Sequence, residues 1–104
     1  MTEIDARSLE HKLSGPDAPL VLDVRNPHEI MAEGAIAGAL LIPMNQFPAR
    51  LDELPKDREI VAVCKSGMRS GRTAEWLRSQ GRKAVNLTGG MDQWRALGLP
   101  VSRG

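Results

Sequence analysis

The chain has 104 residues, a length that suits a single core, so we expect residues 1–104 to form one domain. Hydrophobic residues make up 41% and charged residues 26%, and the net charge of +1 gives no electrostatic reason to expect a nucleic-acid partner. No stretch approaches the roughly 20 apolar residues of a membrane span, and a single cysteine excludes an internal disulfide and a CxxC zinc or redox pair.

The first half of the chain alternates between helical and strand-like patterns. A helix is predicted in DARSLEHKLSG, because Leu9 and Leu13 are four residues apart and a glycine and a proline follow. The run PLVLDVR, residues 19–25, is apolar up to its charged end, which is typical of a buried parallel strand. The remaining elements of this half are a helix over 26–34 with Asn26 as N-cap and Gly34 as its stop, a strand over 39–43, and a short helix or two turns over 45–55.

The second half continues the alternation. The pattern predicts a buried strand over 59–64, a helix over 70–81, a strand over 83–87 and a closing helix over 91–98. Strands that alternate with helices favour an α/β class, with a mostly parallel sheet covered by helices on both faces. Ligands of such sheets bind at the carboxyl ends of the strands, where Cys64, Asp23 and Arg25 would share one edge.

The sequence CKSGMRS, which begins at the only cysteine, is the strongest functional signal in the chain. If the loop 64–69 curls between strand and helix, Gly67 relaxes its tightest point and successive N–H groups point inward. Such a nest, next to a helix N-terminus, attracts anions and lowers the pKa of a cysteine. We therefore expect Cys64 to be an exposed, activated nucleophile rather than an inert core residue.

The spacing within the loop distinguishes two kinds of anion. Four residues separate Cys64 from Arg69. Tyrosine-phosphatase-type loops have one residue more at this point, and in this chain Ser70 stands where the phosphatase arginine would be. A shorter ring of amides suits a single sulfur attached to the cysteine better than it suits a phosphate.

Three blocks of the chain together resemble the single-domain rhodaneses, from about Ile4 to Val101. The blocks are LDVRNPHEI with Asp23, Val24, Arg25, Pro27 and Glu29; CKSGMRS with Cys64 at the nucleophile position; and NLTGGMDQWRALGLPV with Gly89, Gly90, Trp94, Gly98, Pro100 and Val101. One further block departs from the family, because Ala35 replaces the usual histidine and Ala37 a frequent proline. We expect that departure to affect local packing more than chemistry.

The resemblance implies a three-layer rhodanese-like domain with a mostly parallel five-stranded sheet. It also implies a sulfurtransferase that moves a sulfane sulfur from a donor such as thiosulfate to a thiophilic acceptor (cyanide, a thiol or a protein) through a persulfide on Cys64. The residues expected to bind substrate are Lys65, Ser66, Gly67, Met68, Arg69 and Ser70.

The neighbours of the loop have supporting roles in this interpretation. Family analogy places Arg69 across the loop as a brace, with Lys65 and Arg72 as rim cations for the sulfonate of a donor. Asp23 and Arg25 are expected to form an ion pair or capping network beneath the site. Met68 is expected to point outward, and Trp76 and Trp94 are expected to be packing residues. Two interpretations remain open for Arg78, Arg82 and Lys83: they form a solvated helix face, or they belong to a basic rim that attracts anions.

Two alternatives from other classes remain. A rhodanese-like module could bind a partner without chemistry, although the cysteine and its loop are intact. An arsenate-reductase or phosphatase-like enzyme could use the same fold, although the loop spacing and the lack of a second cysteine disfavour it. We expect no metal, cofactor, nucleic-acid or membrane partner. The charged N-terminus does not look like a signal peptide, so the expected location is cytoplasmic.

Overall fold

The computed structural model describes residues 2–103, which build one five-stranded sheet with the strand order β1-β5-β4-β2-β3. Each neighbouring pair of strands in this sheet is parallel. The expected α/β class and five-stranded parallel sheet are therefore confirmed. The strands are β1 (Glu3–Ile4), β2 (Leu20–Asp23), β3 (Leu40–Leu41), β4 (Glu59–Val63) and β5 (Lys83–Leu87).

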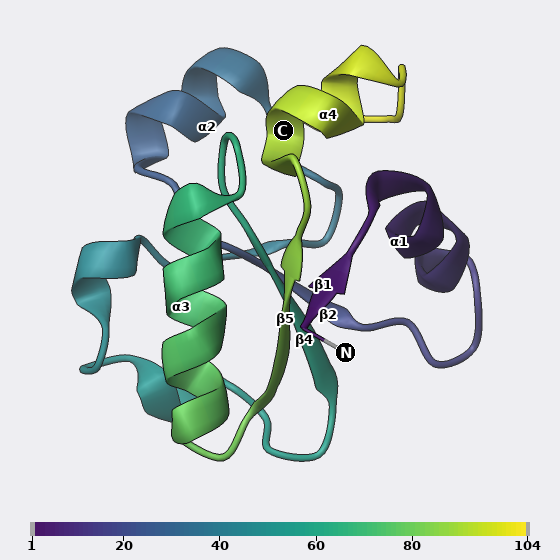
Figure 1. Cartoon of the computed structure of the whole chain (residues 1–104). Helices are drawn as coiled ribbons and strands as arrows, with labels where there is room; N and C mark the ends of the chain where they lie inside the picture. Colours follow the sequence, from purple (N-terminus) through teal and green to yellow (C-terminus); the bar gives the residue numbers. More distant parts are fainter. Residues whose placement is uncertain (1, 104) are drawn as a thin grey trace.

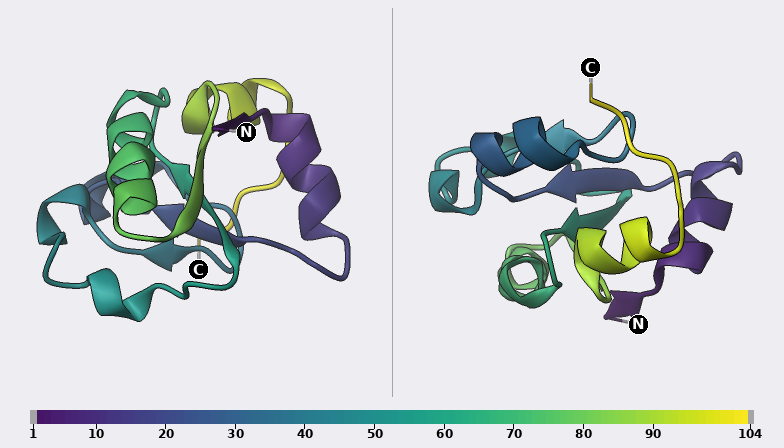
Figure 2. Two further views of the ribbon diagram at one scale, coloured as in Figure 1. Left: turned by 60° about the horizontal axis from the view of Figure 1, so that its bottom comes forward. Right: turned by 90° about the horizontal axis from the view of Figure 1, so that it is seen from above.

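Helices cover both faces of the sheet, as Figure 1 shows. The helix α3 (Met68–Ser79) packs on one face, and α1 (Ala6–Leu13) and α4 (Gly90–Ala96) pack on the other. In both views of Figure 2, α3 lies on the left and α1 on the right, with strands between them. The helix α2 (Pro27–Glu33) lies at the end of the sheet toward which β2 and β4 run (Figure 1).

The two faces of β4 supply the two halves of the core, because side chains along a strand alternate. Val61 and Val63 face the layer of α1 and α4, where Trp94 is buried. Ile60, Ala62 and Cys64 face the layer of α3, together with Ala74 and Leu77 of that helix. The cysteine therefore lies at the top of the core that α3 covers.

Local capping explains where two of the helices begin. The side chain of Asp5 accepts a hydrogen bond of 2.8 Å from the Ser8 N–H at the start of α1. Pro27 occupies the first position of α2, and Glu29 accepts from the Asn26 N–H as in a capping box. These local contacts are of the kind that the sequence made predictable.

Several element bounds differ from those predicted, because tertiary contacts decide them. The strand β1 was not foreseen, since two residues show no alternation; it forms only by pairing with the end of β5. The helix α3 begins two residues earlier than the expected position 70. The segment expected as a helix or two turns has two short 3₁₀ turns, η1 (Met44–Gln46) and η2 (Leu51–Glu53).

The basic residues at the end of α3 do not form one solvated face. Arg82 is buried, and its guanidinium donates to the backbone oxygens of Gln80, Leu51 and Leu54. Arg78 donates to the oxygen of Ala84. Both arginines therefore fasten the turn between α3 and β5 to its neighbours, and a solvated face is the wrong description for Arg82.

Both tryptophans pack against the core, as expected. Trp94 is buried between α4 and the sheet, and its indole N–H donates to Pro100 O at 2.8 Å. The ring of Trp76 lies 5.8 Å from that of Phe47, centroid to centroid.

Candidate active site

The turn 64–67 carries the chain from the end of β4 into α3. Gly67, the residue before the helix, has a φ of 99°. A side chain is strained in this left-handed region, and a Cβ here would lie 3.3 Å from both Leu87 O and Gly89 N. Glycine is therefore the residue that allows so tight an entry into α3.

The loop is shorter than the sequence suggested. Met68 and Arg69 were expected in the loop, with the helix beginning at Ser70, but all three form the first turn of α3. Met68 points outward with 72% of its surface exposed, as expected. Because the first N–H groups of a helix have no partner within the helix, they are free to point at the cysteine.

The carbonyl groups of the loop are fastened to the start of α4. Met91 N–H donates to Cys64 O and Asp92 N–H donates to Lys65 O, each at 2.9 Å. In a planar trans peptide the N–H points away from the C=O, so the N–H groups of Lys65 and Ser66 point away from α4. These two long-range bonds therefore orient the loop amides.

Cys64 is buried, with 1% of its surface exposed, so the expectation of an exposed cysteine is wrong. Its side chain follows the alternation of β4 into the core beneath α3. The Gly67 N–H donates to its sulfur at 3.1 Å, and the Ser70 hydroxyl lies 3.2 Å from the same atom. Burial opposes ionisation, but the hydrogen bonds from Ser70, Gly67 and Ser66 outweigh it and lower the pKa of Cys64.

Arg69 connects α3 to α2 rather than to the loop itself. Its guanidinium makes a bidentate ion pair with Glu29, with Nη1 2.7 Å from Oε1 and Nη2 2.9 Å from Oε2. The hydrogen bonds from Arg69 outweigh burial and hold the pKa of Glu29 at about 2. The pair therefore stabilises the fold above the ordinary carboxyl pKa, and this stabilisation is lost as the pH falls toward 2.

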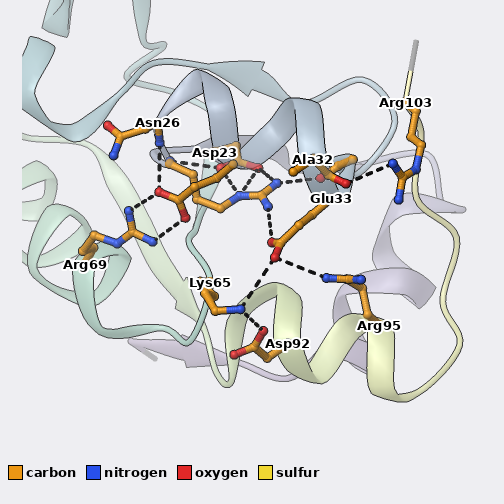
Figure 3. A network of polar contacts seen from close by, with 12 residues as sticks. Asp23, Asn26, Ala32, Glu33, Lys65, Arg69, Asp92, Arg95 and Arg103 are labelled. Carbon is orange, nitrogen blue, oxygen red and sulfur yellow. Dashed lines mark hydrogen bonds and ion pairs between the residues drawn. The ribbon is translucent and has the colours of Figure 1, made fainter.

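A second cluster of charges joins the loop to α2 and α4. Lys65 lies 3.1 Å from Asp92 and 3.7 Å from Glu33. Glu33 also faces Arg95 at 3.6 Å and Arg25 at 3.4 Å, and Figure 3 shows Lys65 and Arg95 pointing toward it. The charge of Lys65 is thus largely compensated by carboxylates. The exposed Arg72 differs, since within residues 2–103 it has no carboxylate partner.

Asp23 and Arg25 form the expected ion pair at the carboxyl end of β2. Both are buried, and Arg25 Nη2 lies 2.7 Å from Asp23 Oδ2. The same nitrogen donates to Gly34 O at 2.8 Å, which fastens the end of α2. Burial disfavours the charged guanidinium, but the hydrogen bonds and charge of Asp23 outweigh it and raise the pKa of Arg25. The pair supports the position of α2 beside the loop.

Asn86 is a polar residue of the site that we did not predict from the sequence. It lies on β5, is buried, and its amide nitrogen donates to Gly67 O at 3.0 Å. Its amide oxygen lies 2.5 Å from the Ser70 hydroxyl. One signal was available, because Asn86 interrupts the otherwise apolar end of the strand KAVNL.

Within residues 2–103, no three or more His, Cys, Asp and Glu side chains gather in a way that could hold a metal ion. None of the described helices has the length and apolar character needed to cross a membrane.

The family model described as rhodanese-like domain matches residues 5–97. The chain belongs to the rhodanese-like domain family. A protein of Allochromatium vinosum named sulfurtransferase is 42% identical to this rhodanese-like domain over 102 residues, 97% of this chain and 94% of the relative. A Bacillus subtilis protein named putative sulfurtransferase YtwF is 40% identical over 88% of each chain.

The solved structures agree with the sequence relatives. The crystal structure of a rhodanese-related protein from Thermoplasma volcanium is 31% identical to this rhodanese-like domain, with a TM-score of 0.92 over 100% of both chains. The resemblance inferred from three short blocks is therefore confirmed over the whole fold.

The lowered pKa of the cysteine in this rhodanese-like domain leads to a first prediction. The rate of Cys64 alkylation by iodoacetamide should rise with pH to a midpoint below the value of about 8.5 typical of a free thiol. Ser70→Ala should raise the midpoint, because it removes a donor to the sulfur. A wild-type midpoint at or above that of a free thiol would mean that the loop amides do not stabilise the thiolate.

Proposed function

We propose that this rhodanese-like domain is a sulfurtransferase that carries a sulfane sulfur on Cys64 as a persulfide. One observation supports the proposal most. The only cysteine lies inside a tight turn before a helix, with N–H donors directed at its sulfur and no histidine base required. Donors of this kind stabilise a thiolate, and they would equally stabilise the terminal anion of a persulfide.

The donor step needs no proton transfer in this scheme. The Cys64 thiolate attacks the outer sulfur of thiosulfate, a new S–S bond forms at Sγ, and the old S–S bond breaks. Sulfite leaves with the bonding electron pair, and the negative charge remains on the outer sulfur of the persulfide. The loop amides and the N-terminus of α3 hold that charge. An acceptor such as cyanide or a thiol then attacks the outer sulfur and regenerates the thiolate.

The rim cations have unequal parts in this proposal. Lys65 is paired with Asp92 and Glu33, so its charge is less available to a donor. Arg72, one turn into α3, is exposed and lacks a carboxylate partner among the described residues. It lines an apolar pocket with Trp76, Phe47 and others, and it is the better candidate to attract the sulfonate of a donor. An acceptor protein could dock on the same side, where Met68 is exposed.

Intact-mass spectrometry tests the proposal directly. Thiosulfate should add one sulfur, about 32 Da, to the wild type, and cyanide should remove it with formation of thiocyanate. Cys64→Ala should gain nothing, because no other cysteine is present. If the wild type gains no mass from thiosulfate or from other sulfane sulfur donors, the domain is better regarded as a partner-binding module. Hydrolysis of an aryl phosphate by the wild type would favour the phosphatase alternative.

A further inference from the structure

The hydroxyl of Ser70 has two acceptors but only one proton. Its oxygen lies 3.2 Å from Cys64 Sγ and 2.5 Å from Asn86 Oδ1. All three side chains are buried, so water does not readily replace a missing hydrogen bond. At any moment the hydroxyl can therefore donate to the sulfur or to the amide oxygen, but not to both.

The amide of Asn86 is held in one orientation. Its nitrogen donates to Gly67 O at 3.0 Å and to Glu3 Oε1 at 3.3 Å. A rotated amide would direct its oxygen at these two acceptors, which would leave three oxygens facing one another without a proton. The amide oxygen of Asn86 therefore stays on the side of Ser70 as a fixed acceptor.

The proton count then differs between the two states of the cysteine. A neutral thiol can donate its own proton to Ser70 Oγ, which leaves the hydroxyl free to donate to Asn86 Oδ1. A thiolate has no proton and needs the hydroxyl as a donor, so the bond to Asn86 must be given up. We propose that Asn86 is a positioning residue that acts through Ser70, with its amide oxygen and the cysteine sulfur competing for the one hydroxyl proton.

This competition is consistent with the proposed sulfur transfer, and its role in the persulfide state rests on that proposed function. In the thiolate state the Ser70 hydroxyl turns toward Sγ. When the outer sulfur is attached, Sγ is neutral and the charge lies on the outer atom, so the Ser70 hydroxyl can again donate its hydrogen bond to Asn86 Oδ1. The hydrogen bond from Ser70 to Asn86 therefore forms again in the persulfide state, and it favours the transfer of sulfur to Cys64. The thiol proton that leaves during activation passes to solvent.

Charged groups lie on the elements packed around the cysteine. They are Arg69 of α3, paired with Glu29 of α2; Lys65 of the loop, with Glu33 of α2 and Asp92 of α4; the Asp23–Arg25 pair after β2; and Glu3 of β1, which contacts Asn86. His28 on α2 is exposed. A change at Asn86 removes its contact to Glu3 equally in the Ser70 and Ser70→Ala backgrounds. A double-mutant cycle therefore cancels the contribution of Glu3 and of the other charged groups.

The test is the alkylation midpoint of Cys64 in four proteins: the wild type, Ser70→Ala, Asn86→Leu and the double variant. Leucine has the same branching at Cγ as asparagine, with methyl groups in place of the amide oxygen and nitrogen, and therefore offers no acceptor. We compare the effect of Asn86→Leu on the midpoint in two backgrounds. With Ser70 present, the substitution should move the midpoint to lower pH than it does in the Ser70→Ala background, by roughly half to one pH unit. Loss of the contact to Gly67 loosens the loop in both backgrounds and therefore drops out of the comparison.

A second substitution keeps the test decisive if Asn86→Leu does not fold by circular dichroism. Asn86→Asp keeps an acceptor oxygen and strengthens it with a charge, so its upward shift of the midpoint should be larger with Ser70 in place than in the Ser70→Ala background. Equal shifts in the two backgrounds, or a coupling of the opposite sign, would overturn the proposal and leave Asn86 with a purely structural role. Because alkylation needs no sulfur donor, the result is independent of whether sulfur transfer itself is demonstrated.

Discussion

Insertion of one glycine between Met68 and Arg69 should reduce sulfur transfer from thiosulfate to cyanide on the order of a hundredfold. The added residue falls within the first turn of α3 and displaces residues 64–68 relative to the rest of the helix, while Arg69 can keep its ion pair with Glu29. The amides now directed at Cys64 Sγ, such as Gly67 N–H at 3.1 Å, would be displaced by about 1 Å, and misplaced donors stabilise a terminal sulfur poorly. The measurement is the steady-state rate of thiocyanate formation.

A matched insertion separates this effect from a general loss of stability. One glycine between Pro16 and Asp17 lengthens an exposed turn at the opposite end of the sheet, and activity should stay within about twofold of the wild type. Thermal unfolding of both variants gives the stability change of each. If the insertion after Met68 leaves the rate unchanged, the size of the loop does not control sulfur transfer.

Gly90→Ala should be comparably damaging, because it pushes α4 away from the loop. Gly90 has a φ of 56°, and a Cβ there would overlap Cys64 O and lie 2.6 Å from Lys65 O. Both neighbours are backbone atoms, so the bonds from Met91 and Asp92 to these oxygens would have to lengthen. We expect a loss of sulfur transfer on the order of a hundredfold and a raised alkylation midpoint, because the loop amides lose their orientation.

Gly98→Ala is the control for backbone strain. Gly98 follows α4 with a φ of 72°, but a Cβ at this position meets no atom within 4 Å. Gly98→Ala should therefore lower the free energy of unfolding by about 1–2 kcal/mol, the same backbone penalty that Gly90→Ala carries, while sulfur transfer is retained. Near-normal activity of folded Gly90→Ala would show that the loop does not depend on its attachment to α4.

The sequence alone determined the class of fold and indicated Cys64 as the candidate nucleophile. Alternation of apolar runs with capped helical segments predicted a parallel sheet between helices, because strand and helix periods depend on neighbouring residues only. The turn after Cys64 was also predictable, because Gly67 permits a backbone conformation that other residues rarely adopt. A tight loop at the carboxyl end of a strand was sufficient to indicate an anion site.

Only the tertiary structure decided how the site is assembled. In the folded protein Cys64 is buried, the Met91 N–H of α4 donates to Cys64 O, and the Asn86 side chain lies in hydrogen-bond contact with Ser70. The tertiary structure also showed which cations are compensated: Lys65 is surrounded by carboxylates and Arg72 is not. These contacts join residues that are far apart in the chain. Their geometry depends on how whole elements pack, and no local pattern of residues specifies the direction in which a side chain finally points.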